Sequence, residues 1–195
     1  MALIVITPPA LEPITVSEAK ASPSLRLSVA TDDTDITALI KTARLMAETH
    51  TMHALVTQTL ELVLDGFPDG GIVVPMPPLQ SVTSIKYIDE DGVQQTLSAL
   101  LYSVDTNTVP GLITPAYGES WPATRDEINA VRVRFVAGFG AASDVPEDIK
   151  SWIKITVGTM YDNPQGLVVG QTVASVPSRY IDALLHNYRF KAITF

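Results

Sequence analysis

The chain has no cysteine, only three histidines, and fewer cationic than anionic side chains. Without cysteine it can form no disulfide framework, no thiolate nucleophile and no cysteine-built zinc or iron–sulfur site. Thirteen lysines and arginines against twenty-one aspartates and glutamates give a formal net charge of -8, the wrong sign for a surface that neutralises phosphates. The composition therefore argues against tight general binding of nucleic acid, although an acidic passage would let DNA slide through without adhering.

Long apolar runs are also missing, so no membrane-spanning segment is predicted. Met1 to Ile6 is apolar, but no lysine or arginine precedes it and Pro8 and Pro9 follow at once, which is not typical of a signal peptide. Hydrophobic residues make up 46% of the 195 residues, enough to build the core of about one domain, with or without an inserted one. We expect a protein that is made in a cytoplasm and stays out of the membrane.

Helical patterns occupy the two ends of the chain. Thr15 to Glu18 has the form of a capping box, and the helix that follows must be short because Pro23 removes an amide donor. Acidic residues then precede an amphipathic pattern that predicts a helix from Asp33 to about Thr51. Another helix is predicted from Pro146 to Asn163, and Pro177 opens a last one.

The middle of the chain has the period of two that is typical of strands. Leu60, Leu62 and Leu64 alternate with other residues, and Val131 to Phe135 does the same. Val82 to Ile88 leads into the turn Asp89 to Gly92, the strongest hairpin signal in the chain. Weaker strand candidates are Ile72–Val74, Tyr102–Asp105 and Gly111–Thr114.

These patterns predict an α+β fold in which an antiparallel α-helical bundle carries an inserted antiparallel β-rich region. We expect residues 1–55 to form an N-terminal helical part, 56–140 the inserted β-rich region and 141–195 a C-terminal helical part, together one compact subunit. No internal repeat is present.

No motif assembles a convincing catalytic or metal site. Gly138 to Ser143 lacks the third glycine of a phosphate-binding turn, and the acidic residues that follow would repel a phosphate. Gly118 to Pro122 starts like a nucleophile elbow but ends in proline. His50 and His53 have no obvious third ligand, and we interpret them as residues of a helix end. We therefore predict no enzyme, no catalytic residue, no cofactor and no metal.

The order of segments and several phrases resemble the phage head-tail connector proteins of long-tailed phages, also called adaptor or head-completion proteins. The likeness covers nearly the whole chain, and the phrases that carry it are Pro13–Lys20, Asp35–Ile40, Ala43–Arg44, Ala47–Glu48, Thr57–Leu62, Pro77–Val82, Pro115–Pro122 and Val131–Gly138. The chain departs from the pattern at Ser22-Pro23, where the first helix usually continues, and near Met52, where a glycine is usual.

The resemblance implies a structural virion protein with a head-tail connector-like fold and no catalytic residue. It implies a homo-oligomeric ring, generally of twelve copies, beneath the portal protein and above the stopper or tail-completion protein. Such a ring surrounds the channel through which genomic DNA passes without specific binding. The protein would be made in the host cytoplasm and reside in the neck of the virion, at the head-tail interface.

Two sets of residues are candidate contact sites in such a ring. We expect the C-terminal region to dock on the portal, and the alternative is that its helix only closes the subunit core; the docking residues are Tyr180, Leu184, Leu185, Tyr188, Phe190 and Phe195. The hairpin tip and a later loop would face the channel or the next tail-side ring, and the alternative is a set of solvated turns; these residues are Asp89, Glu90, Asp91, Gly166 and Gly170.

Two rival functions stay open from the sequence. One is another neck or tail-completion protein, such as the stopper. The other, more distant, is a cell-wall hydrolase, which would need carboxylates that converge in one concave site and have separated pKa values.

Overall fold

A computed structural model describes residues 1–23, 25, 32–163 and 183–189. The chain divides into two compact units, each described by itself below. The strand unit consists of Met1–Ala10 and Thr57–Phe139, and the helical unit of Leu11–Val56 and Gly140–Phe195. The chain therefore passes from one unit to the other near residues 10, 56 and 139.

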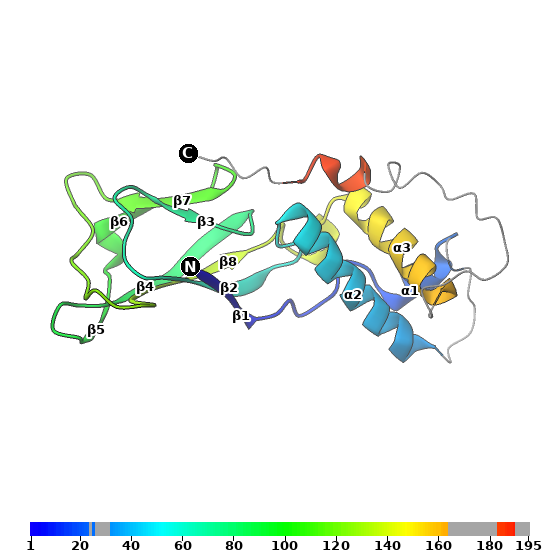
Figure 1. Cartoon of the computed structure of the whole chain (residues 1–195). Coiled ribbons are helices and arrows are strands. Elements are labelled where there is room, and N and C mark those ends of the chain that lie inside the picture. The colour runs from blue at the N-terminus through cyan, green and yellow to red at the C-terminus, as the bar shows by residue number, and fades with distance from the viewer. Residues whose placement is uncertain (24, 26–31, 164–182, 190–195) are drawn as a thin grey trace. The chain divides into compact units, whose positions relative to one another are not determined.

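The strand unit contains two antiparallel sheets (Figure 1). The larger sheet has five strands in the order β1-β2-β8-β4-β5, with bounds Ala2–Thr7, Gln58–Leu64, Val131–Ala137, Leu79–Ile88 and Gln94–Thr96. The smaller has three strands in the order β3-β7-β6, with bounds Ile72–Val74, Gly111–Pro115 and Tyr102–Asp105. A short 3-10 helix, Ala99–Leu101, leads into β6.

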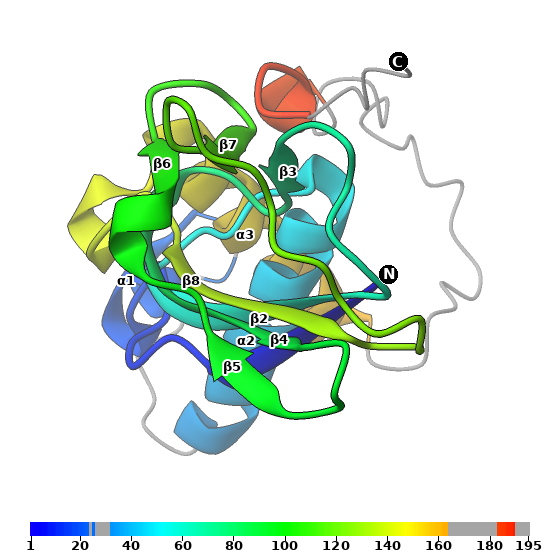
Figure 2. The same cartoon turned by 90° about the vertical axis from the view of Figure 1, so that its left-hand side faces the viewer.

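The core of the strand unit lies between the sheets, which face each other in Figure 2. Leu60 of β2 pairs with Phe135 of β8, so the two side chains lie on the same face of the sheet, and both are buried. Every second residue along each strand points to this face. The sheets approach so closely at Gly111 that a Cβ there would lie 2.5 Å from the Leu79 side chain. Glycine at this position is therefore a packing requirement.

The helical unit consists of α1 (Val16–Ala21), α2 (Asp33–Thr51), a 3-10 turn (Ala142–Asp144), α3 (Glu147–Asp162) and helical residues 183–186. Helices α2 and α3 pack against each other (Figure 1). Their buried side chains recur every three or four residues, as a packed helix face requires: Ile36, Ile40, Ala43 and Ala47 on α2, and Ile149, Ile153 and Val157 on α3.

Predictions of helix starts and ends are confirmed where the sequence signal lies within a few neighbouring residues. The Thr15 hydroxyl accepts the Glu18 amide at 3.1 Å, and the Glu18 carboxylate accepts the Thr15 amide at 2.7 Å, so the capping box is present. The helix from Asp33 ends at Thr51, as expected. It stops because Met52 adopts the left-handed conformation, with φ 57°, a position that favours glycine.

The expected α-helical bundle is wrong. The described chain is a mixed α/β structure with antiparallel sheets, and only α2 and α3 are long helices. One reason for the difference is the N-terminus, which was expected to belong to the helical part but forms strand β1 at Ala2–Thr7 and pairs with β2. An apolar hexapeptide without alternation has no periodicity from which a strand could be predicted. The division at residues 55 and 140 stays a prediction, and the helix expected after Pro177 begins outside the described residues.

Candidate interaction surfaces

Candidate metal and catalytic residues do not converge in the described part of the chain. Within it, no group of three histidine or acidic side chains could hold a metal ion. His50 is exposed on α2, whereas His53 is buried after the helix and its Nδ1 donates to the Thr51 carbonyl oxygen at 2.9 Å. Burial lowers the pKa of His53, which favours the neutral ring and makes it unlike a cation at a helix end.

The two glycine-containing motifs are structural turns. In the first, Gly138 and Gly140 have positive φ, and the Asp144 carboxylate accepts the Ala141 amide at 2.8 Å. The Ala141 amide, which a bound phosphate would need as a hydrogen-bond donor, thus already donates to a carboxylate. In the second motif, the Trp121 ring stacks on Phe67 with centroids 4.8 Å apart, and its Nε1 donates to a backbone carbonyl oxygen at 2.8 Å.

The described carboxylates with displaced pKa values all serve local structure or ion pairs. Hydrogen bonds from the Thr15 backbone lower the pKa of Glu18, and those from the Asn107 backbone lower the pKa of Asp105. Hydrogen bonds from Gln95 and then from the Val93 amide lower the pKa of Asp89. A general acid at neutral pH needs a raised pKa instead, so nothing among these groups favours the hydrolase alternative.

The predicted hairpin tip lies between β4 and β5. Asp89 is built into the turn, because its carboxylate accepts the Val93 amide and the Gln95 side-chain amide, each at 2.8 Å. Gly92 has φ 82°, and the exposed Glu90 and Asp91 form the tip. Two carboxylates are therefore free to face a neighbour or solvent, while Asp89 holds the turn. Gly166 and Gly170 lie outside the described residues.

The predicted portal-docking residues are only partly described. Leu184 and Tyr188 are half-buried, and Leu185 is fully buried. Leu185 thus serves as a core residue in this structure, while docking by Leu184 and Tyr188 stays a prediction. Tyr180, Phe190 and Phe195 lie outside the described residues.

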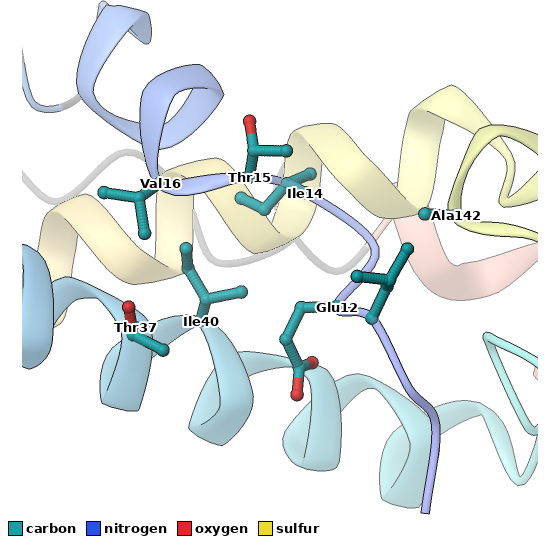
Figure 3. Close-up of a pocket in the computed structure, with 8 residues that line it drawn as sticks. Glu12, Ile14, Thr15, Val16, Thr37, Ile40 and Ala142 are labelled. Atoms are coloured by element: carbon teal, nitrogen blue, oxygen red, sulfur yellow. The ribbon is translucent and has the colours of Figure 1, made fainter.

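An apolar groove of about 230 Å³ opens on the helical unit (Figure 3). It lies between the segment before α1, helix α2 and the 3-10 turn, and its lining residues are Leu11, Glu12, Ile14, Thr15, Val16, Thr37, Ile40 and Ala142. Figure 3 shows Ile14 and Ile40 facing each other across it. The groove is small enough to take one or two apolar side chains of a partner, rather than a cofactor.

Next to this groove a buried ionic network joins α2 to two of the three chain segments that lead out of the unit. Arg44 donates to Glu12 at 2.7 Å and to Glu48 at 2.6 Å, and Glu48 also accepts the Leu55 amide at 3.1 Å. The Arg44 and Glu48 side chains are 4% and 6% exposed. The network is therefore largely shielded from solvent, and it fixes residues 12 and 55 on the same helix.

A second ionic cluster lies on the outer face of the larger sheet. Glu61 of β2 accepts hydrogen bonds from Arg132 at 3.1 Å and from Arg134 at 2.8 Å. Burial acts to raise the pKa of Glu61, but the two arginines outweigh it and hold that pKa below its usual range. Sequence reasoning missed this cluster, although Arg132 and Arg134 alternate with buried residues on β8 and so had to share a face.

No helix in the described part of the chain is long and apolar enough to cross a bilayer.

No protein-family model matches the chain, and no curated protein matches it. Three solved structures are similar over 100% of this chain and 98% of theirs. Their sequences are too distant to show more than a shared fold.

The first of these chains comes from the virion of a native gene transfer agent (GTA) particle, with 21% identity and a TM-score of 0.79. The second is from the neck of an empty GTA particle computed with C6 symmetry, with 19% identity and a TM-score of 0.81. The third is from the neck of a native GTA particle computed with C12 symmetry, with 20% identity and a TM-score of 0.77.

Proposed function

We propose that this chain is a structural protein of the neck of a tailed phage or phage-like particle. The observation that carries the proposal is the likeness, over the full length of both chains, to chains of virion and neck structures. A match that includes both units and their connections is more informative than one shared sheet or helix pair, because it requires the same insertion of one unit into the other. The protein acts by shape and contact rather than by catalysis.

More specifically, we propose a head-tail connector, or adaptor, that forms a ring between the portal and the stopper or tail. The neck structures of the similar chains were computed with C6 and C12 symmetry, which supports a ring of twelve copies. In a head-to-tail ring each subunit presents two different surfaces, one to each neighbour. A chain with net charge -8 also suits a channel through which DNA must pass without adhering.

Within this proposal the C-terminal region docks on the portal and the hairpin tip faces the channel or the tail side. Leu184 is half-buried and so keeps part of its surface exposed to a partner, whereas Leu185 is fully buried. Removal of residues 191–195 should weaken portal binding without unfolding the protein. Unchanged portal affinity of the truncated protein would contradict this docking site.

Electron microscopy of the purified protein mixed with its portal tests the adaptor role directly. We expect a closed ring on the outer end of the portal. The same protein should also be found in the neck of finished particles, by antibody labelling. Absence from the neck would refute the proposal.

The stopper is the second candidate, because the similar structures are of the neck as a whole and not of one level within it. The two roles differ in binding order. An adaptor binds portal rings that carry no other neck protein, whereas a stopper binds only after the adaptor is in place. Capture of bare portal rings by the purified protein therefore favours the adaptor, and failure on bare portals with success on adaptor-loaded portals favours the stopper.

A further inference from the structure

The outer side of helix α2 exposes apolar residues, although a surface helix normally turns its charged residues to solvent. Leu45 and Met46 are 48% and 47% exposed, and Met52, the residue directly after the helix, is 49% exposed. Two charged residues of α2 lie on its buried side instead, since the Arg44 and Glu48 side chains are only 4% and 6% exposed. Contiguous exposed apolar patches mark contact sites for other proteins. The distribution therefore indicates that the outer side of α2 is covered in the working state.

The exposed uncharged residues of α2 repeat at the interval that one helix presents to another. They form a row, called here the α2 row, with spacings of four, three, four and three residues: Ala38, Thr42, Leu45, Thr49 and Met52. This is the heptad pattern of a helix–helix contact. Both threonine hydroxyls already donate to backbone carbonyl oxygens of α2, at 2.9 and 2.8 Å, so neither needs a water molecule as acceptor. At a rise of about 1.5 Å per residue the row is about 21 Å long, which fits a partner helix.

Helix α3 also has an uncharged side that is directed away from its buried residues. Ile155 is half-buried, and Ser151 and Thr159, about one helical turn before and after it, are exposed. Ile155 is two residues from both Ile153 and Val157, which are fully buried. Two positions along a helix turn a side chain by about 200°, so Ile155 points away from the buried side of α3.

We propose that the α2 row is covered by helix α3 of a second copy of this chain, bound head to tail. The inference rests on the proposed function, since it identifies the contact between neighbouring subunits of the ring. Helices α2 and α3 of one copy pack against each other through their buried sides, so their outer sides face in opposite directions. Each copy thus presents two unlike surfaces on opposite sides of its helical unit, which is what a head-to-tail ring requires.

The length of the α2 row and the symmetry of a ring limit which element can cover it. In the described part of the chain only α2 and α3 are long helices, and α1 has six residues. Helix α3 has sixteen residues and is about 24 Å long, so it spans the whole row. Contact between the α2 helices of two copies would follow a two-fold axis and close after two copies, which gives a dimer and no ring. Helix α3 is therefore the element that meets both conditions.

A pair of matched substitutions tests whether the α2 row is an interface. Leu45→Glu places a charge in the row, and Val73→Glu is the control, since Val73 is 45% exposed on β3 of the strand unit. Both side chains already contact solvent, so we expect both variants to keep the wild-type circular dichroism. Leu45→Glu should reduce ring occupancy on the portal at least about tenfold, because the carboxylate would be desolvated in the contact, and the control should not. Ala38→Glu, at the other end of the row, should give the same loss, and control-level occupancy for both row variants would overturn the interface.

Photo-cross-linking identifies what covers the α2 row. The chain has no cysteine, so a Leu45→Cys variant can be labelled at that single position with benzophenone maleimide. In rings on the portal, we expect a product of twice the subunit mass, in which mass spectrometry locates the cross-link in α3. A cross-link to α2 of the second copy, to the portal, or only within one chain would overturn the proposal.

The outcomes separate this contact from the proposed function on which it rests. If the wild-type protein forms no ring on the portal, the proposed function itself fails, and the contact fails with it. If wild-type rings form but the row variants assemble as well as Val73→Glu, only this interface fails. If the row variants lose the ring and the cross-link lies in α3 of a second copy, both are supported.

Discussion

Replacement of Arg44 by methionine should strongly destabilise the helical unit. Arg44 neutralises two carboxylates, and its own side chain is 4% exposed. Methionine retains much of the apolar volume but removes both ion pairs, so Glu48, only 6% exposed, loses Arg44 as its counter-ion. Loss of one partner from a buried ion pair typically costs about 3–5 kcal/mol. This is a large fraction of the roughly 5–15 kcal/mol that keeps a domain folded.

The magnitude follows from burial, and the chain offers a control that separates burial from charge. Arg125 pairs with Glu127 at 3.6 Å, but these side chains are 55% and 42% exposed. An exposed pair of this kind contributes at most about 1 kcal/mol. Arg125→Met should therefore have a small effect, although the substitution is chemically identical to Arg44→Met.

Unfolding in urea, followed by tryptophan fluorescence, measures the loss of stability in the helical unit, which contains Arg44. The chain has two tryptophans: Trp121 lies in the strand unit and Trp152 on α3. A Trp121→Phe background leaves Trp152 as the only reporter, so the helical unit is observed separately. With a slope of about 2 kcal/mol per M, a loss of about 3–5 kcal/mol lowers the midpoint by about 1.5–2.5 M.

Removal of all three charges tests the mechanism. Arg44→Met combined with Glu12→Gln and Glu48→Gln removes every charge of the network, and the side-chain amide oxygen introduced at position 48 can still accept the Leu55 amide. We expect the triple variant to regain most of the stability lost by Arg44→Met. If Arg44→Met lies within about 1 kcal/mol of Arg125→Met, the reasoning from desolvation is refuted.

Three further predictions concern individual residues. The pKa of Glu61 is lowered in the folded state, so the ionised Glu61 side chain stabilises the fold fully above its ordinary pKa, and this stabilisation is lost as pH falls through the folded-state pKa. The difference in unfolding free energy between wild type and Glu61→Gln should therefore shrink from pH 7 to pH 3. A difference that stays constant over this range would contradict the prediction. Gly111→Ala should destabilise the strand unit by about 1–3 kcal/mol through its clash with Leu79, whereas Gly70→Ala, which meets nothing within 4 Å, should stay within about 1 kcal/mol of wild type in the same denaturation assay. Thr15→Ala removes the capping hydroxyl and should lower the unfolding free energy by about 1 kcal/mol, and a thermal melt equal to wild type would show that α1 does not need its cap.

The local structure around the candidate contact residues was predictable where it depends on neighbouring residues, while the contacts themselves stay predictions. The acidic hairpin tip was placed correctly between two strands, because a turn rich in aspartate and glycine after an alternating segment is a local signal. Its internal use of Asp89 was not predictable, since the hydrogen bond to Gln95 depends on how the return strand is aligned. For the same reason, the burial of Leu185 could not be read from its place in an amphipathic stripe.

The amino-acid sequence by itself determined the elements whose signals lie within a few residues: the capping box at Thr15, helix α2 and the turn after Ile88. Only the tertiary structure decided which elements pair. Strand β1 acquires its identity from β2, more than fifty residues later, and Glu61 meets Arg134 across 73 positions of sequence. Hydrogen bonds inside a helical turn are fixed by local geometry, whereas strand pairing and buried ion pairs depend on contacts that form only when distant segments pack together.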